Sequence, residues 1–158
     1  MGIVNSPSTY AGFPIGLEVA PCDVVLKISA TVAAGDVVAI APGATEGNRF
    51  TTTKAPATAN TSTDDNEFGV FAVALEAATY VDAITTVYAK FRVQGVVDAK
   101  IFGTPGKGAA VAVKETTKDL QAPALGNKIV GFMMEDGVSG QLKQVLFDGL
   151  NGFGTRHA

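Results

Sequence analysis

Few side chains in this sequence of 158 residues could do chemistry, and most of them stand alone. The one histidine, His157, is the penultimate residue, where no rigid element can hold it against a substrate or a metal ion. The one cysteine, Cys22, follows Pro21 and has no histidine nearby in sequence that could activate its thiol. We therefore expect neither residue to be a nucleophile or a metal ligand.

Carboxylates are the next candidates. Glu76 and Glu135 each end an apolar run, and a pair of carboxylates could work as general acid and general base. The simpler interpretation is that each residue ends a strand at the protein surface. Asp64, Asp65 and Glu67 could bind calcium, but they lack the alternate-position spacing of a calcium-binding loop. A solvated acidic loop is the favoured interpretation.

A glycine-rich turn, Gly103–Gly108, superficially resembles a phosphate-binding loop because Lys107 lies between two glycines. The Walker pattern requires a glycine where Ile101 stands, and Ser or Thr directly after the lysine, where Gly108 stands. A hairpin turn explains the segment. The sequence therefore predicts no enzyme, no metal site and no cofactor.

Strands are the elements that would position any such group. The clearest one covers residues 87–94, where apolar residues alternate with larger polar or amphipathic ones. Val87, Ala89, Phe91 and Val93 fall on one face, and Tyr88, Lys90, Arg92 and Gln94 fall on the other. A period of two is typical of a strand with one buried face and one solvated face. Lys90 and Arg92 are interpreted as salt-bridge or interface residues, not as a basic binding patch.

Other apolar segments separated by turns predict strands at 24–30, 37–41, 69–75, 109–113, 120–122, 128–135 and 141–147. We predict an all-β fold, a compact β-sandwich or β-barrel-like domain over residues 24–148 with a long exposed loop at about 47–67. Residues 1–23 and 149–158 are predicted to be extended N- and C-terminal arms. Their isolated apolar side chains are candidate partner-contact residues: Tyr10, Phe13, Ile15, Leu17 and Phe153. The N-terminal arm either lies over its own domain as a mobile terminus or docks on a neighbouring subunit.

The two halves of the sequence are weakly similar. Three pairs of segments correspond: 35–40 with 108–113, 72–76 with 131–135, and 87–94 with 141–147. Each half has a glycine before its first strand and a glutamate after its second. The pattern predicts two similar β-units packed together, although Val- and Ala-rich strands also resemble one another by chance.

Composition excludes several classes of protein. The chain has 12 Lys and Arg against 15 Asp and Glu, without a basic cluster, so we expect no nucleic-acid partner. No segment approaches about 18 uninterrupted apolar residues, so we expect no membrane span. The N-terminus lacks the basic and apolar regions of a secretory signal, and one cysteine excludes an intrachain disulfide.

The order of the elements resembles the head-decoration, or capsid cement, proteins of tailed bacteriophages. Five segments carry the resemblance: AGDVVAI (34–40), GVFAVALE (69–76), FRVQGVVD (91–98), GKGAAV (106–111) and KIVGFMME (128–135). It covers roughly residues 30–148. The resemblance implies a β-rich structural protein on the outer capsid surface, made in the host cytoplasm and often trimeric. It also implies that the major capsid protein is the partner, with neighbouring capsid subunits clamped together. The family has no catalytic residues to carry over.

Alternatives stay open at this point. The Thr- and Asn-rich loop together with Tyr80 and Tyr88 could form a receptor- or carbohydrate-binding module displayed on a virion, although the absence of Trp counts against it. A tail-tube building block is another possibility. A hydrolase that uses Glu76 or Glu135 is the least favoured.

Overall fold

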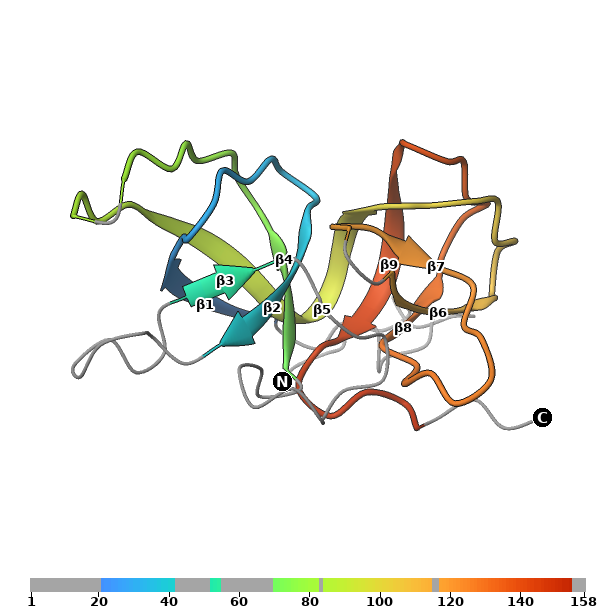
Figure 1. Ribbon diagram of the computed structural model, residues 1–158. Coiled ribbons are helices and arrows are strands. Elements are labelled where there is room, and N and C mark those ends of the chain that lie inside the picture. The colour runs from blue at the N-terminus through green and yellow to red at the C-terminus, as the bar shows by residue number, and fades with distance from the viewer. Residues whose placement is uncertain (1–20, 42–51, 55–69, 83, 115–116, 155–158) are drawn as a thin grey trace, which may run out of the picture.

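The computed structural model describes residues 21–41, 52–54, 70–82, 84–114 and 117–154. These residues form nine strands and no helix, so the predicted all-β fold is confirmed (Figure 1). The strands are β1 (Cys22–Lys27), β2 (Val37–Ala41), β3 (Thr52–Lys54), β4 (Phe71–Ala74), β5 (Tyr88–Lys100), β6 (Ala110–Val113), β7 (Leu120–Gln121), β8 (Gly131–Met133) and β9 (Leu142–Asp148).

All strand pairs are antiparallel, and the sheet has the order β3-β2-β4-β5-β9-β8-β6-β7, with β1 paired to β5. The sheet curls into a nearly closed, barrel-like form. On one side β1 approaches β3, and on the other Ile101 forms a parallel bridge with Leu120. In Figure 1, β5 passes between a group made of β1–β4 and a group made of β6–β9.

Strand β5 confirms the predicted alternation and extends it beyond Gln94 to Lys100. The extension passes through Gly95, which has a φ of +120°. A Cβ at this position would lie 3.1 Å from the Cα of Pro21, so glycine allows the chain entering β1 to cross β5 closely. One long strand therefore serves both groups of strands.

The predicted similarity between the halves is visible in the backbone hydrogen bonds. Corresponding bonds have nearly equal lengths: Gly35 N to Ala74 O and Gly108 N to Met133 O (both 2.8 Å), and Leu75 N to Lys90 O and Met134 N to Gln144 O (both 2.9 Å). Gly35 and Gly108 also have similar φ angles, 84° and 81°, in the left-handed conformation that both turns require. The fold therefore contains two similar β-units, as predicted.

The structure also shows where the second unit begins, which the sequence comparison missed. The bond from Ile28 N to Val87 O (3.0 Å) corresponds to the bond from Ile101 N to Gln141 O (3.1 Å). The second half of β5 is thus the counterpart of β1. We call residues 22–94 unit 1, with strand order β3-β2-β4-β5-β1, and residues 95–148 unit 2, with strand order β7-β6-β8-β9-β5.

Each unit has its own apolar core, and β2 and β4 separate the two cores. Because side chains alternate along a strand, one face of this strand pair belongs to each core. The unit 1 core receives Val38, Ile40, Ala72 and Ala74. The unit 2 core receives Val37, Ala39, Phe71 and Val73. These strands therefore carry continuous apolar runs instead of an alternating pattern.

Candidate functional site

The two candidate carboxylates have the same structural role in their units. One carboxylate oxygen of Glu76 accepts a hydrogen bond from the backbone N–H of Lys90 (3.0 Å). The carboxylate of Glu135 accepts the corresponding bond from Gln144 N–H (2.9 Å) and lies 3.6 Å from Lys143 Nζ. Each side chain is held on the backbone of its own unit. This supports the interpretation of strand-ending residues.

The backbone amides of the glycine-rich turn are engaged by its own chain. Gly103 N–H donates to Ser139 Oγ at 3.2 Å, and Lys107 N–H donates to Asp136 Oδ1 at 2.8 Å. A phosphate would have to displace these partners, and the Asp136 carboxylate would repel it. The turn instead holds residues 133–139 in place through these hydrogen bonds, which is a structural role.

The remaining candidates are only partly covered by the described residues. Cys22 is exposed and carries a free thiol. The residues that lie outside the described ranges are His157, Asp64, Asp65, Glu67, Tyr10, Phe13, Ile15 and Leu17. Within those ranges, no group of three His, Cys, Asp or Glu side chains could hold a metal ion. None of the described segments is a helix long and apolar enough to cross a membrane.

Phe153 is the one predicted contact residue that the structure describes. Its ring packs edge-on against Phe132, with 5.0 Å between centroids and 66° between the ring planes. Its N–H donates to Ile129 O at 2.8 Å, which fixes the backbone beside β8. The side chain is still 42% exposed. An anchored but half-exposed aromatic ring is suited to contact with a partner.

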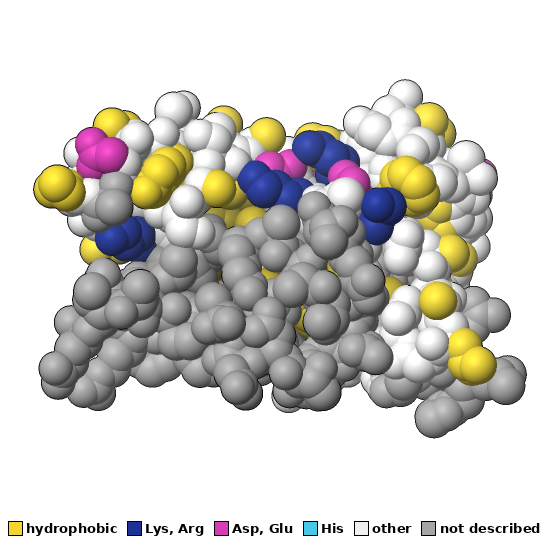
Figure 2. Space-filling view, viewed as in Figure 1, with side chains coloured by type: hydrophobic (Ala, Val, Ile, Leu, Met, Phe, Trp, Pro, Cys, Tyr) yellow, Lys and Arg dark blue, Asp and Glu magenta, His cyan; other side chains and the backbone are white. Residues whose placement is uncertain are grey.

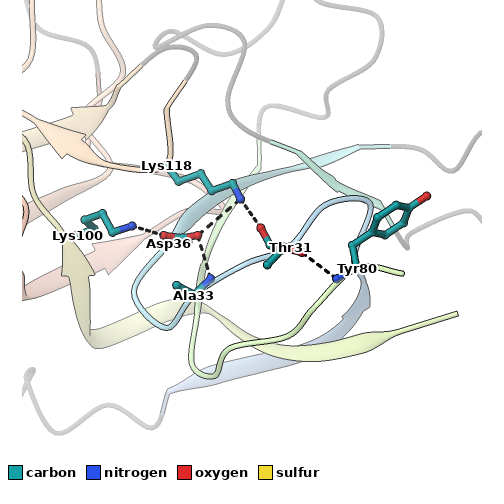
Figure 3. Close-up of polar contacts among 6 residues, drawn as sticks. All are labelled: Thr31, Ala33, Asp36, Tyr80, Lys100 and Lys118. Atoms are coloured by element: carbon teal, nitrogen blue, oxygen red, sulfur yellow. Dashed lines mark hydrogen bonds and ion pairs between the residues drawn. The ribbon is translucent and has the colours of Figure 1, made fainter. Parts of the chain in front are cut away.

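A polar cluster around one buried carboxylate joins the two units (Figure 3). Asp36, which is only 4% exposed, precedes β2 in unit 1. Its carboxylate accepts a hydrogen bond from Lys100 Nζ in β5 (2.7 Å) and from the backbone N–H of Ala33 (3.0 Å). Lys118 Nζ lies 3.6 Å from the second oxygen. Because both lysines come from unit 2, the carboxylate acts as a clamp between units.

The same cluster reaches the neighbouring loops. Lys118 Nζ also donates to the backbone oxygen of Thr31, and the hydroxyl of Thr31 accepts a hydrogen bond from Tyr80 N–H at 3.0 Å. The Tyr80 side chain packs against the unit 1 core, whereas Tyr88 is 54% exposed. Only one of the two tyrosines considered for carbohydrate stacking is therefore largely free at the surface.

An ion pair on β1 and β5 confirms the interpretation of Arg92 as a salt-bridge residue. The guanidinium donates to both carboxylate oxygens of Asp23, at 2.8 and 3.1 Å, and to Val96 O at 2.7 Å. The hydrogen bond from Arg92 lowers the pKa of Asp23, and the same bond raises the pKa of Arg92. On the face in Figure 2, Lys and Arg side chains stand close to Asp and Glu side chains instead of forming one basic patch.

An apolar groove lies on unit 1 and has a volume of about 350 Å³. The described residues that line it are Cys22, Val24, Leu26, Ile40, Val70, Val93 and Leu150. They come from β1, β2, β5, the residue before β4 and the segment after β9, so no local sequence pattern could have revealed them together. Such a pocket can bind apolar side chains, and its described lining holds no charged side chain.

Comparisons with known proteins give one similarity, which concerns the fold. No family model matches the sequence, and no curated protein matches it. Among solved structures, the chain is similar to the N base of head fiber gp8.5 in bacteriophage phi29, with 10% sequence identity and a TM-score of 0.57. The similarity covers 88% of this chain and 100% of that chain. At this identity the finding shows a shared fold: the chain resembles the base of a phage head fiber.

Proposed function

We propose that this chain is a structural virion protein attached to the outer surface of a tailed-phage capsid. The observation that carries the proposal is the fold shared with a phage head fiber base over nearly the whole chain. The order of elements in the sequence independently resembles capsid decoration proteins. The candidate carboxylates Glu76 and Glu135 are engaged in holding strand ends, which fits a binding protein.

In the finer form of this proposal, the chain binds the major capsid protein and stabilises contacts between neighbouring capsid subunits, as a homotrimer. The terminal segments, 1–23 and 149–158, carry the contacts. Phe153 supports this because its half-exposed ring is anchored beside β8. Extended apolar segments can add to the sheet edge of a neighbour through main-chain hydrogen bonds, without a preformed groove. Neither nucleic acid nor a membrane is a partner in this proposal.

The test is binding to expanded capsids that lack the protein. Purified protein should sediment with such capsids in a density gradient, with a copy number that matches the three-fold or quasi-three-fold positions. Deletion of residues 2–20 should leave a folded protein, checked by far-ultraviolet circular dichroism, that no longer sediments with capsids. Full-length protein that stays free of the particles would refute attachment. A deletion that unfolds the domain would count against the N-terminal segment as the binding element.

A second candidate function is the base of a longer head fiber, which the similarity to the gp8.5 N base favours. In that case the chain would anchor a projecting element instead of clamping capsid subunits. Electron microscopy of particles that carry the protein distinguishes the two functions. A projection beyond the bound domain would favour the fiber base, whereas a compact domain that increases capsid resistance to heat would favour cement.

A further inference from the structure

We propose that the unit 1 groove receives residues 13–19 of a second copy of this chain. The inference deepens the proposed function, since a capsid-attached protein acts in many copies. It concerns self-association, which can be measured without capsids. If the protein does not self-associate, capsid attachment is unaffected. If the protein does not attach to capsids, self-association can still be tested.

The groove lies in unit 1, at the position where an additional layer of side chains covers the equivalent strands of unit 2. The unit 2 positions that correspond to Val24, Leu26, Ile40 and Val93 are Val97, Ala99, Val113 and Phe147. All four unit 2 side chains are at most 4% exposed. In unit 1, Leu26 and Val93 are buried as well (6% and 2% exposed), but Ile40 is 9% exposed and Val24 is only partly buried. All four of these unit 1 side chains line the groove. The same strand framework is covered in one unit and grooved in the other.

The layer that covers unit 2 is made of alternate apolar side chains on extended strands. They are Val37 and Ala39 on β2, and Phe71 and Val73 on β4, all members of the unit 2 core. By contrast, the described residues of the unit 1 core all lie within unit 1. The chemistry that fits the groove is therefore an extended segment with apolar side chains at every second position.

Residues 13–19 have this pattern. Phe13, Ile15, Leu17 and Val19 alternate with Pro14, Gly16 and Glu18. In an extended conformation the four apolar side chains fall on one face, with the glutamate on the other. The described chain starts two residues later, at Pro21, and its next residue, Cys22, lines the groove. The described chain thus begins at the edge of the groove, close in sequence to the matching segment.

Pro21 disfavours a turn that would bring this segment back into its own groove. Because β1 lines that groove at Cys22, Val24 and Leu26, the chain before β1 would have to reverse direction to enter it. Pro21 disfavours the helical conformation in Ala20, and a proline is itself disfavoured at the third position of a type I turn. Pro21 is also placed closely over Gly95. If the chain before Pro21 is extended, the groove of a neighbouring copy is the better-placed acceptor.

Such a contact is heterologous, because the segment of one copy meets the groove of the next. It generates a ring if the rotation between copies closes, and an open chain if it does not. This geometry provides a sharp test. A copy with a defective segment and a copy with a defective groove can still form one contact together, but that pair cannot extend further.

The experiment measures the mass of the purified full-length protein in solution by light scattering over a range of concentrations. The segment variant combines Phe13→Ser, Ile15→Ser and Leu17→Ser, and its control is a deletion of residues 2–11. The groove variant is Leu150→Glu, where the leucine is 40% exposed, and its control is Leu125→Glu, where the leucine is 67% exposed and outside the groove. Circular dichroism checks that every variant is folded.

We expect the wild type and both controls to associate, and the two test variants to lose affinity for self-association by roughly a hundredfold or more. A mixture of the segment variant and the groove variant should yield a heterodimer and nothing larger. Wild-type protein that is monomeric throughout would overturn the inference, as would association that survives the segment variant. A monomer whose groove binds a hydrophobic dye only after deletion of residues 2–20 would show that the segment fills its own groove.

Discussion

Removal of the Asp36 carboxylate should weaken the link between the two units. The carboxylate is almost fully buried and contacts Lys100 Nζ at 2.7 Å, Lys118 Nζ at 3.6 Å and the N–H of Ala33 at 3.0 Å. Asp36→Ala leaves two ammonium groups and one amide without this partner. Breaking a fully buried ion pair by removing one member costs about 3–5 kcal/mol.

The expected cost is smaller than this because the lysines are not fully buried. The side chains of Lys100 and Lys118 are 34% and 26% exposed, so their ammonium groups can regain water. We therefore expect Asp36→Ala to lower the free energy of unfolding by about 2–3 kcal/mol. For a chain of this length that loss corresponds to a decrease in Tm of about 4–12 °C. Asp36→Asn should cost less, since its amide oxygen can still accept from Ala33.

Urea unfolding followed by far-ultraviolet circular dichroism measures these values, because the chain has no tryptophan for fluorescence. Double-mutant cycles then separate the two lysines. The coupling of Asp36 to Lys100 should be larger than its coupling to Lys118, since the first distance is shorter by 0.9 Å (3.6 minus 2.7). A loss below about 1 kcal/mol for Asp36→Ala would refute the clamp between units, and a larger coupling to Lys118 would refute the order given for the two contacts.

Three further predictions test individual contacts. Gly149→Ala should destabilise the fold by about 1–3 kcal/mol or more, because its Cβ would overlap the backbone of β4, whereas Gly106→Ala should be nearly neutral; urea unfolding compares the two. Asp23→Asn should cost less than about 1 kcal/mol at neutral pH, since it removes a partly exposed pair with Arg92. Because the pKa of Asp23 is lowered in the folded state, the pair with Arg92 stabilises the fold at pH values above the unfolded pKa. The difference in stability between Asp23→Asn and wild type should therefore disappear as the pH falls through the folded pKa. A difference in stability that grows in acid would contradict this. Glu135→Ala should cost about 1 kcal/mol in thermal unfolding, and Glu135→Gln should restore most of it because the amide oxygen can accept the same backbone N–H.

Local pattern predicted the elements of the fold because both of its signals are short-range. Alternation along residues 88–94 identifies a strand without knowledge of its partner, since side chains on a strand alternate between faces. Gly35 and Gly108 mark equivalent turns in the two units because each turn requires a positive φ that glycine adopts easily. Glu76 and Glu135 are predicted to end strands for a similarly local reason, because each follows an apolar run.

The groove and the clamp could not be predicted in this way. Asp36 meets Lys100 and Lys118 from distant parts of the chain, and the lining of the groove comes from five separate segments. Sequence spacing does not encode which strand edges or faces meet, because those choices depend on pairing across the whole sheet. The function of β2 and β4 as a wall between two cores likewise depends on both units being present.

By itself, the sequence determined an all-β chain with two similar units and few reactive groups, because strand periodicity, turn glycines and composition are local properties. Three features are visible only in the folded chain: the units share β5, Asp36 joins the units, and unit 1 carries an apolar groove. The physical reason is that a strand has two faces and two edges, and the sequence of one strand does not state which of its neighbours will occupy them.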